Sequence, residues 1–217
     1  MNLNVKQLEY PEDSNIKFFD SDSEDFKLIS IDEAILADEY HKDDSSDEKV
    51  LSYMNRGNKV LYDYMVTLDG TIYKITPPHK RGNASKFNLY SSRMCKELPD
   101  LCPLYELDDE NATPPDVKVV SICVESSIKS NVPTNKQKYS LEHLLAYLFK
   151  KYTIRASKLI TRNMIPKEEK KKREIGHKYF SDGVTISNLI LLASHGLSID
   201  EKDDITIIES PLQVPKR

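Results

Sequence analysis

The sequence contains no tryptophan, and only six glycines and three cysteines occur among its 217 residues. Sugar-binding proteins commonly use flat aromatic faces, of which tryptophan offers the largest, so the chain lacks the best side chain for that purpose. With so few glycines there is no glycine-rich phosphate loop, and nucleotide binding has no support. Cys95, Cys102 and Cys123 form no CxxC pair, and Cys123 lies in an apolar run, where a small core residue is expected.

The histidines and the overall charge exclude further classes of protein. The five histidines lie far apart and none forms an i, i+3 or i+4 pair, so they predict no zinc site. The net charge of -4 argues against a general nucleic-acid binder, which needs a basic face. No apolar run approaches the roughly 20 residues that cross a bilayer. We therefore expect no nucleic acid, no membrane, no metal and no other cofactor.

The N-terminal part of the chain predicts an appendage rather than a targeting signal. Residues 1–25 lack the apolar core of a signal peptide, so we expect the chain to stay in the cytoplasm of the producing cell, unless lysis or a particle carries it out. Because residues 11–25 are acidic and polar, residues 1–25 are expected to form an acidic arm. The remaining 26–217 has the length of one domain. Within it, residues 77–116 have little periodicity, which is typical of a binding loop or an insertion.

The periodicity of apolar residues predicts an α/β fold. A continuous apolar run at 117–124 is typical of a central strand buried on both faces. Ser140 is the expected cap of the clearest helix, and Pro211 is expected to end a late edge strand. The predicted strands are 26–31, 117–124, 158–161 and 204–210, the predicted helices are 45–57, 140–152 and 186–196, and a hairpin occupies 60–76. This order predicts a mixed central sheet with flanking helices.

The hairpin carries a resemblance to a known family. The residues LYDYMVTLDGTIYKI (61–75) resemble the hairpin of the zinc N-acetylmuramoyl-L-alanine amidases and the related peptidoglycan recognition proteins, including phage lysozymes of amidase type. That family reads Gly-Tyr-His-Tyr and Asp-Gly-Thr-Ile-Tyr at this point. Other matching segments follow in the family's order, namely RGNAS (81–85), VVSICVE (119–125), KLITRNMIP (158–166) and KREIGHKYF (172–180). The resemblance implies an amidase-like fold over roughly residues 26–195.

The same resemblance places unsuitable residues at the family's zinc-ligand positions. The first ligand position falls on Asp32, the second on Arg162 and the third on Glu174. A carboxylate can bind zinc, but a guanidinium has no free lone pair and carries its own positive charge. Two further family histidines, one in the hairpin and one in the following loop, correspond to Asp63 and Asn83. The resemblance therefore implies a degenerate member, with no metal.

Two of the family's cleft residues are retained. Tyr62 corresponds to a tyrosine that lines the catalytic cleft, and Lys172 to a lysine near the scissile bond in some phage members. A packed strand tyrosine and one lysine of a basic run are the commoner roles for such residues. We also expect Asp32, Arg162 and Glu174 to converge if the fold is right, forming a nearly charge-balanced cluster in place of the metal.

These residues predict a catalytically inactive amidase-like domain that serves as a structural or binding module. By analogy with phage amidases, and from the Lys-, Asn-, Ile- and Asp-rich composition, a virion tail or baseplate component is the specific expectation. Its partners would be other virion or host proteins, with peptidoglycan possible. One alternative is an active zinc amidase with displaced ligands. Another is a phage-encoded regulator or inhibitor of a host protein.

Overall fold

The computed structural model describes eleven stretches of the chain. They are residues 2–12, 14–20, 26, 28–34, 36, 44–55, 61–82, 119–126, 133–154, 159–161 and 205–215. The predicted helix at 186–196 and most of the loop at 77–116 lie outside them. No helix in these stretches is long and apolar enough to cross a bilayer.

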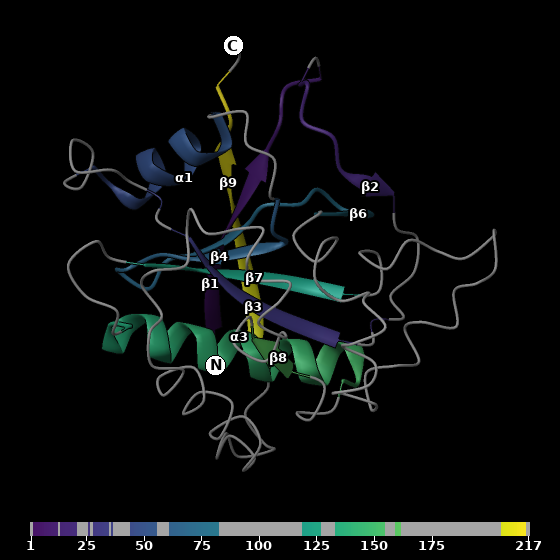
Figure 1. The fold of residues 1–217 in the computed structure, drawn as a ribbon, viewed down its shortest axis with the longest axis vertical. Helices are drawn as coiled ribbons and strands as arrows, with labels where there is room; N and C mark the ends of the chain where they lie inside the picture. Colours follow the sequence, from purple (N-terminus) through teal and green to yellow (C-terminus); the bar gives the residue numbers. More distant parts are fainter. Residues whose placement is uncertain are drawn as a thin grey trace, which may run out of the picture.

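A seven-stranded sheet forms the centre of the molecule, in the order β8-β3-β7-β4-β5-β1-β9 (Figure 1). Its strands are β1 (Asn2–Glu9), β3 (Leu28–Ala34), β4 (Tyr64–Val66), β5 (Ile72–Lys74), β7 (Val119–Glu125), β8 (Leu159–Thr161) and β9 (Thr206–Gln213). β4 and β5 are antiparallel, and every other neighbouring pair is parallel. A small second sheet pairs β2 (Phe19–Asp20) with β6 (Lys80–Arg81). The predicted α/β fold with a mixed sheet is confirmed.

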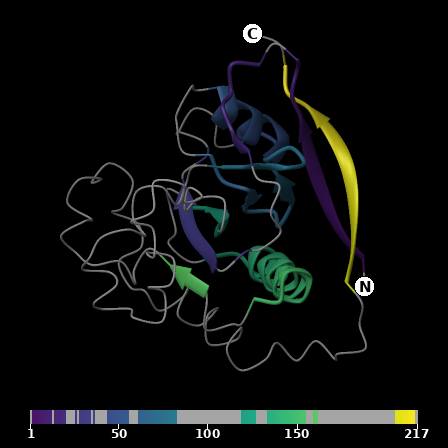
Figure 2. The ribbon, with the colours of Figure 1, turned by 90° about the vertical axis from the view of Figure 1, so that its right-hand side faces the viewer.

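Two helices cover opposite faces of the sheet. The helix α3 (Asn135–Tyr152) packs Leu141, Leu144, Leu145 and Leu148 against one face, together with Ile122 of β7. The shorter helix α1 (Ser46–Asn55) belongs to a second apolar cluster, which contains Cys123 of β7. Because side chains alternate along a strand, neighbouring residues of β7 point to different helices. Figure 2 shows α1 and α3 on either side of the central strands.

The central strand β7 agrees with its prediction. All seven of its residues are buried, and it lies between the parallel strands β3 and β4. A strand covered on both faces reads as an unbroken apolar run, which explains why the sequence alone identifies it.

The capping residues differ in part from those predicted. α1 begins as expected, because the Ser45 hydroxyl accepts a hydrogen bond from the Glu48 N–H while the Glu48 carboxylate accepts one from the Ser45 N–H. α3 instead begins five residues before Ser140, because Thr134 and Gln137 form a capping box. Ser140 lies inside the helix, and its hydroxyl donates to the Gly70 carbonyl. The prediction of Ser140 as the cap is therefore wrong.

Both ends of the chain lie in the sheet. β1 lies between β5 and β9, and buries Leu3, Val5 and Leu8 (Figure 2). The expectation was that residues 1–25 form an acidic arm. The acidic residues that suggested an arm all follow Lys6, whereas the alternation of Leu3 and Val5, which is typical of a strand, precedes them.

The C-terminal strand is at the sheet edge, as expected, but it is longer than predicted. Pro211 lies within β9, opposite Gln7 of β1, and does not end the strand. An edge strand tolerates proline because one of its sides needs no ladder hydrogen bond.

The predicted hairpin is confirmed as β4 and β5, and its turn has three residues. Gly70 has φ of +85°, whereas Asp69 is not among the described residues with positive φ. The Gly70 N–H donates to the Thr67 carbonyl, and the Thr67 N–H to the Thr71 carbonyl. This pattern is a three-residue loop with one left-handed glycine rather than the two-residue turn in which both central residues have positive φ.

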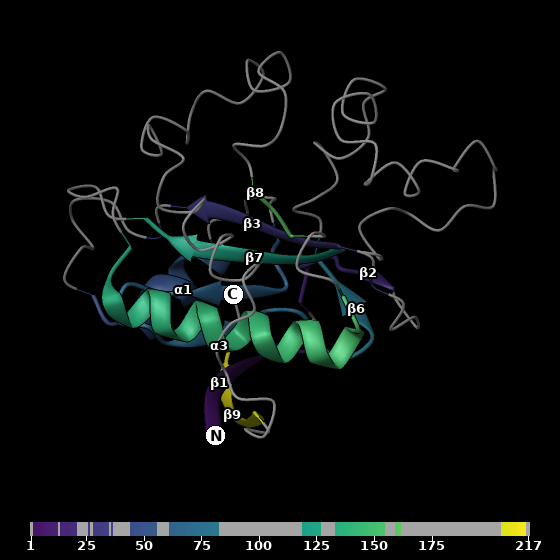
Figure 3. The ribbon, with the colours of Figure 1, turned by 90° about the horizontal axis from the view of Figure 1, so that it is seen from below.

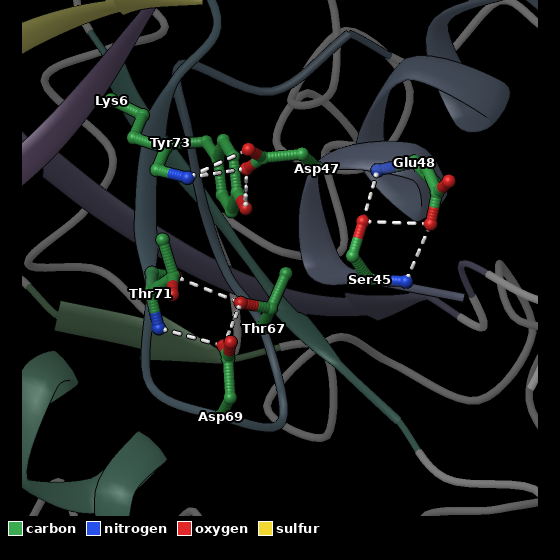
Figure 4. A network of polar contacts seen from close by, with 8 residues as sticks. All are labelled: Lys6, Ser45, Asp47, Glu48, Thr67, Asp69, Thr71 and Tyr73. Carbon is green, nitrogen blue, oxygen red and sulfur yellow. Dashed lines mark hydrogen bonds and ion pairs between the residues drawn. The ribbon is translucent and has the colours of Figure 1, made fainter. Parts of the chain in front are cut away.

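A polar network joins this hairpin to α1 and β1 (Figure 4). Lys6 and Tyr73 both donate to the Asp47 carboxylate, at 2.7 and 2.6 Å. Asp69 accepts hydrogen bonds from the Thr67 hydroxyl and the Thr71 N–H. Partial burial raises the pKa of the Asp69 carboxyl, but these hydrogen bonds outweigh it and lower the pKa to about 2. The ionised form of Asp69 therefore stabilises the hairpin.

We predict that Asp69→Asn changes how stability depends on pH. Because the folded pKa lies below the ordinary 3.8, the contribution of Asp69 is complete above about pH 5 and disappears as pH falls through about 2. Since Asp69 is exposed, we expect about 1 kcal/mol at pH 6 and roughly half of that at pH 3. Urea unfolding of both proteins at the two pH values measures the difference, and a difference that does not change with pH would contradict the assignment.

Candidate functional site

The α1 side of the sheet carries a group of polar residues where β3, β4 and β7 lie side by side. Asp32 of β3 is half-buried, and the Tyr62 hydroxyl, just before β4, donates to its Oδ2 at 3.1 Å. Tyr62 itself is only 4% exposed, so it is a packed tyrosine as well as a partner of Asp32. Of the residues the sequence selected, the structure thus brings Asp32 and Tyr62 together.

Apolar and aromatic groups surround this pair. Cys123 lies opposite Asp32 in the β3–β7 register and is fully buried, as predicted for a small core residue. Tyr53 of α1 lies close enough for the charges of Cys123 and Asp32 to act on it. Burial first, and then these two groups, raise the pKa of the Tyr53 phenol. The half-buried Asp32 carboxylate therefore faces water on one side. On the other side it faces tyrosine phenols and apolar side chains.

Asp63, which the resemblance places at the family's hairpin histidine, is a buried junction. Its Oδ2 accepts hydrogen bonds from the Ser121 N–H at 2.8 Å and the Ser121 hydroxyl at 3.0 Å, and its Oδ1 accepts one from the Gly82 N–H at 3.1 Å. Only 3% of Asp63 is exposed. Burial raises the pKa of this carboxyl, while the charge of Arg81 and the donors from Ser121 and Gly82 oppose the rise.

Gly82 permits this junction because of its size. A Cβ at this position would lie 2.0 Å from the Leu61 carbonyl oxygen, so a side chain would push the chain away from β4. The close approach brings the Gly82 N–H to Asp63. Next to Gly82, the Arg81 guanidinium lies over the Phe26 ring at 4.2 Å and donates through Nη1 to the Lys80 carbonyl.

Sequence reasoning missed Ser121 and Gly82 as partners of Asp63. A signal for Ser121 existed, since it is the one residue with a hydroxyl in the apolar run of β7, and a buried hydroxyl requires a partner. No signal in the sequence reveals that Gly82 contacts the residues before β4. Arg162, Lys172, Glu174 and Asn83 lie outside the described residues, so the expected cluster of Asp32 with Arg162 and Glu174 stays a prediction. Across the described stretches, no three His, Cys, Asp or Glu side chains lie close enough to hold a metal ion.

Comparison with solved structures identifies the fold. A crystal structure of a selenomethionine derivative of AmpD aligns with a TM-score of 0.50 at 12% identity, covering 85% of this chain and 93% of that one. The amidase LysC from Clostridium intestinale URNW aligns at 0.42 and 19% identity, covering 77% and 95%, and PGRP-Hd from Alvinella pompejana at 0.45 and 12%, covering 79% and 87%. The AmpD alignment shows that the two chains share a fold.

Residues 30–184 match the family described as N-acetylmuramoyl-L-alanine amidase. This match covers more than half of the chain, and the chain belongs to that family. Comparison with curated proteins finds no match. The segment includes the first and last candidate ligand positions, Asp32 and Glu174.

We predict that Asp63→Ala strongly destabilises the fold. The change leaves two N–H groups and one hydroxyl buried without their acceptor, so we expect a loss of about 3 kcal/mol in the free energy of unfolding. Urea unfolding measures the loss, and Glu12→Ala, which removes an exposed carboxylate, should change stability by less than about 0.5 kcal/mol. Equal stabilities of the two variants would show that Asp63 is not a junction.

Proposed function

We propose that the protein is a catalytically inactive member of the amidase family that serves as a structural or binding module. The observation that carries this proposal is the state of Asp32. It stands at the position of the family's first zinc ligand, and its carboxylate accepts the hydroxyl of Tyr62. A zinc site of this kind needs three protein donors, and Asp32 supplies one of them.

The residues at the other two ligand positions support the same proposal. The sequence has Arg162 at the second position and Glu174 at the third. A guanidinium offers no lone pair and repels a dication, so the three residues do not fit a zinc site. In amidases of this kind the metal supplies the hydroxide that attacks the amide, and neither Tyr62 nor Lys172 replaces it.

A zinc-reconstitution experiment tests this proposal. The wild-type chain is expected to purify with much less than one zinc per molecule and to leave N-acetylmuramoyl-L-alanine substrates intact. The triple variant Asp32→His, Arg162→His and Glu174→Cys restores a neutral-imidazole and thiolate donor set, and is expected to bind about one zinc. Elemental analysis after dialysis measures the metal.

Two controls make the outcome decisive. The double variant Asp32→His and Glu174→Cys retains Arg162 and should bind zinc no better than wild type. Circular dichroism shows whether each variant is folded. Wild-type chain that carries one zinc and loses amidase activity with a chelator would overturn the proposal and favour the active enzyme with displaced ligands, a function that family membership itself supports.

We propose that this module is a component of a virion. Its partners would be other virion or host proteins, and it would retain affinity for peptidoglycan. Family analogy with phage amidases supports this proposal, and so does the Lys-, Asn-, Ile- and Asp-rich composition. Before assembly the chain would remain in the cytoplasm of the producing cell.

We predict that this chain is present in purified particles in a fixed copy number. Quantitative mass spectrometry of particles after protease treatment and density-gradient purification measures it, with a known capsid protein as reference. A chain found in infected-cell lysate but absent from particles would contradict the virion role. Sedimentation with insoluble peptidoglycan separately tests whether the wall is still bound.

A further inference from the structure

The outer face of α3 carries an ordered set of basic and aromatic residues that the site does not use. Lys136, Tyr139, His143, Tyr147 and Lys150 follow one another at spacings of three, four, four and three residues. At 3.6 residues per turn this spacing places all five along one side of the helix. We call this set the α3 stripe. By the helical repeat the stripe lies away from the leucines that face the sheet, although Tyr147 also packs partly against their cluster. Figure 3 shows the helix along its length.

The sign of the charge on this helix differs from that of the protein. α3 contains four lysines and one glutamate, whereas the whole chain has a net charge of -4. The glutamate, Glu142, lies beside the α3 stripe and not within it, by its position in the helical repeat. Three described acidic residues, Asp47, Glu48 and Asp69, belong to the network around α1 and the hairpin.

The rings of the α3 stripe differ in exposure, since Tyr139 is exposed whereas His143 and Tyr147 are half-buried. Tyr139 is 53% exposed, and its ring lies 4.1 Å from the His143 ring, centroid to centroid. His143 donates through Nδ1 to the Tyr139 carbonyl at 2.6 Å, because a carbonyl can only accept, and this bond orients the imidazole. Nearby, the Lys151 ammonium lies 5.8 Å from the Tyr147 ring. An exposed, oriented tyrosine such as Tyr139, with cations on the same helix face, is typical of protein-binding surfaces.

The arrangement specifies the chemistry of a partner. The two lysines of the stripe are separated by fourteen residue steps, or roughly 21 Å along the helix. This length matches an extended peptide of about seven residues. Positive charge is concentrated at the two ends, and rings occupy the centre. A uniformly charged polymer such as polyphosphate would place its central phosphates against the aromatic rings. No lysine of the stripe lies there to neutralise them.

We propose that the α3 stripe is a docking surface for an extended segment of a partner protein with acidic residues at both ends and apolar or aromatic residues between them. The surface is on the other side of the sheet from Asp32, so the proposal is independent of whether that site hydrolyses anything. It adds a second, protein-binding surface to the module.

A peptide-binding experiment on the full chain tests this proposal. The probe is a fluorescein-labelled peptide, Glu-Glu-Phe-Leu-Tyr-Glu-Glu, and fluorescence anisotropy at low ionic strength measures its dissociation constant. The variant Lys136→Glu with Lys150→Glu is expected to weaken binding about tenfold or more, because two exposed ion pairs become repulsive contacts. Tyr139→Ala should weaken it several-fold without changing the charge.

The matched control is Lys17→Glu with Lys138→Glu, which makes the same change in net charge. Lys17 is exposed on another segment, and Lys138 is on α3 but off the stripe, so binding should stay within about twofold of wild type. Equal weakening by both double variants would show a nonspecific charge effect and overturn the proposal.

Other occupants of the surface give different results. Inorganic polyphosphate or a hepta-glutamate peptide that binds as tightly as the probe would mean that the surface recognises charge alone, and would overturn the proposal. Sedimentation velocity gives the remaining outcome. Self-association of the wild-type chain that the stripe variant abolishes would identify a second copy as the occupant, and would also overturn it.

Discussion

The backbone and carboxylate of Asp63 together join four segments of the chain. Its N–H donates to the Ser121 carbonyl of β7, and its carbonyl accepts the Ile75 N–H just after β5. Its carboxylate accepts hydrogen bonds from Ser121 and Gly82. One residue thus connects the entry to β4 with the central strand, the end of the hairpin and the segment after β6. Tyr62, next to Asp63 in the chain, donates its hydroxyl to Asp32, whose own position is set by the pairing of β3 with β7.

A buried carboxylate of this kind is costly unless its partners are complete. Three donors and the nearby Arg81 offset the loss of hydration, and Gly82 makes one of those donors available by closely approaching Leu61. Asp63 is therefore an acidic group integrated into the core of this protein.

The two faces of the sheet have different surroundings. On the α1 side, Asp32, Tyr62 and Tyr53 lie above a buried thiol and within a partly polar surface. On the α3 side, the sheet is covered by leucines, and the outer surface of the helix is basic and aromatic. The sheet thus separates a partly polar surface around Asp32 from a basic and aromatic surface on the outer side of α3.

Periodicity alone predicted β7, the hairpin, α1 and the body of α3. Each of these elements buries apolar side chains at a regular spacing, and that spacing can be read from the sequence. It did not predict β1, whose short alternation Leu3, Val5 becomes a strand only when β5 and β9 flank it. It misplaced the start of α3, since Ser140 and Thr134 are both acceptable caps and the Thr134–Gln137 pair decides between them.

By itself the sequence determined the family and the order of the main elements. The tertiary structure decided that Tyr62 donates to Asp32, that Asp63 is bonded to Ser121 and Gly82, and that Pro211 lies inside an edge strand. Local patterns record which face of an element is apolar. Contacts between residues about 30 and 60 positions apart depend on how the strands are ordered in space, which no local pattern contains.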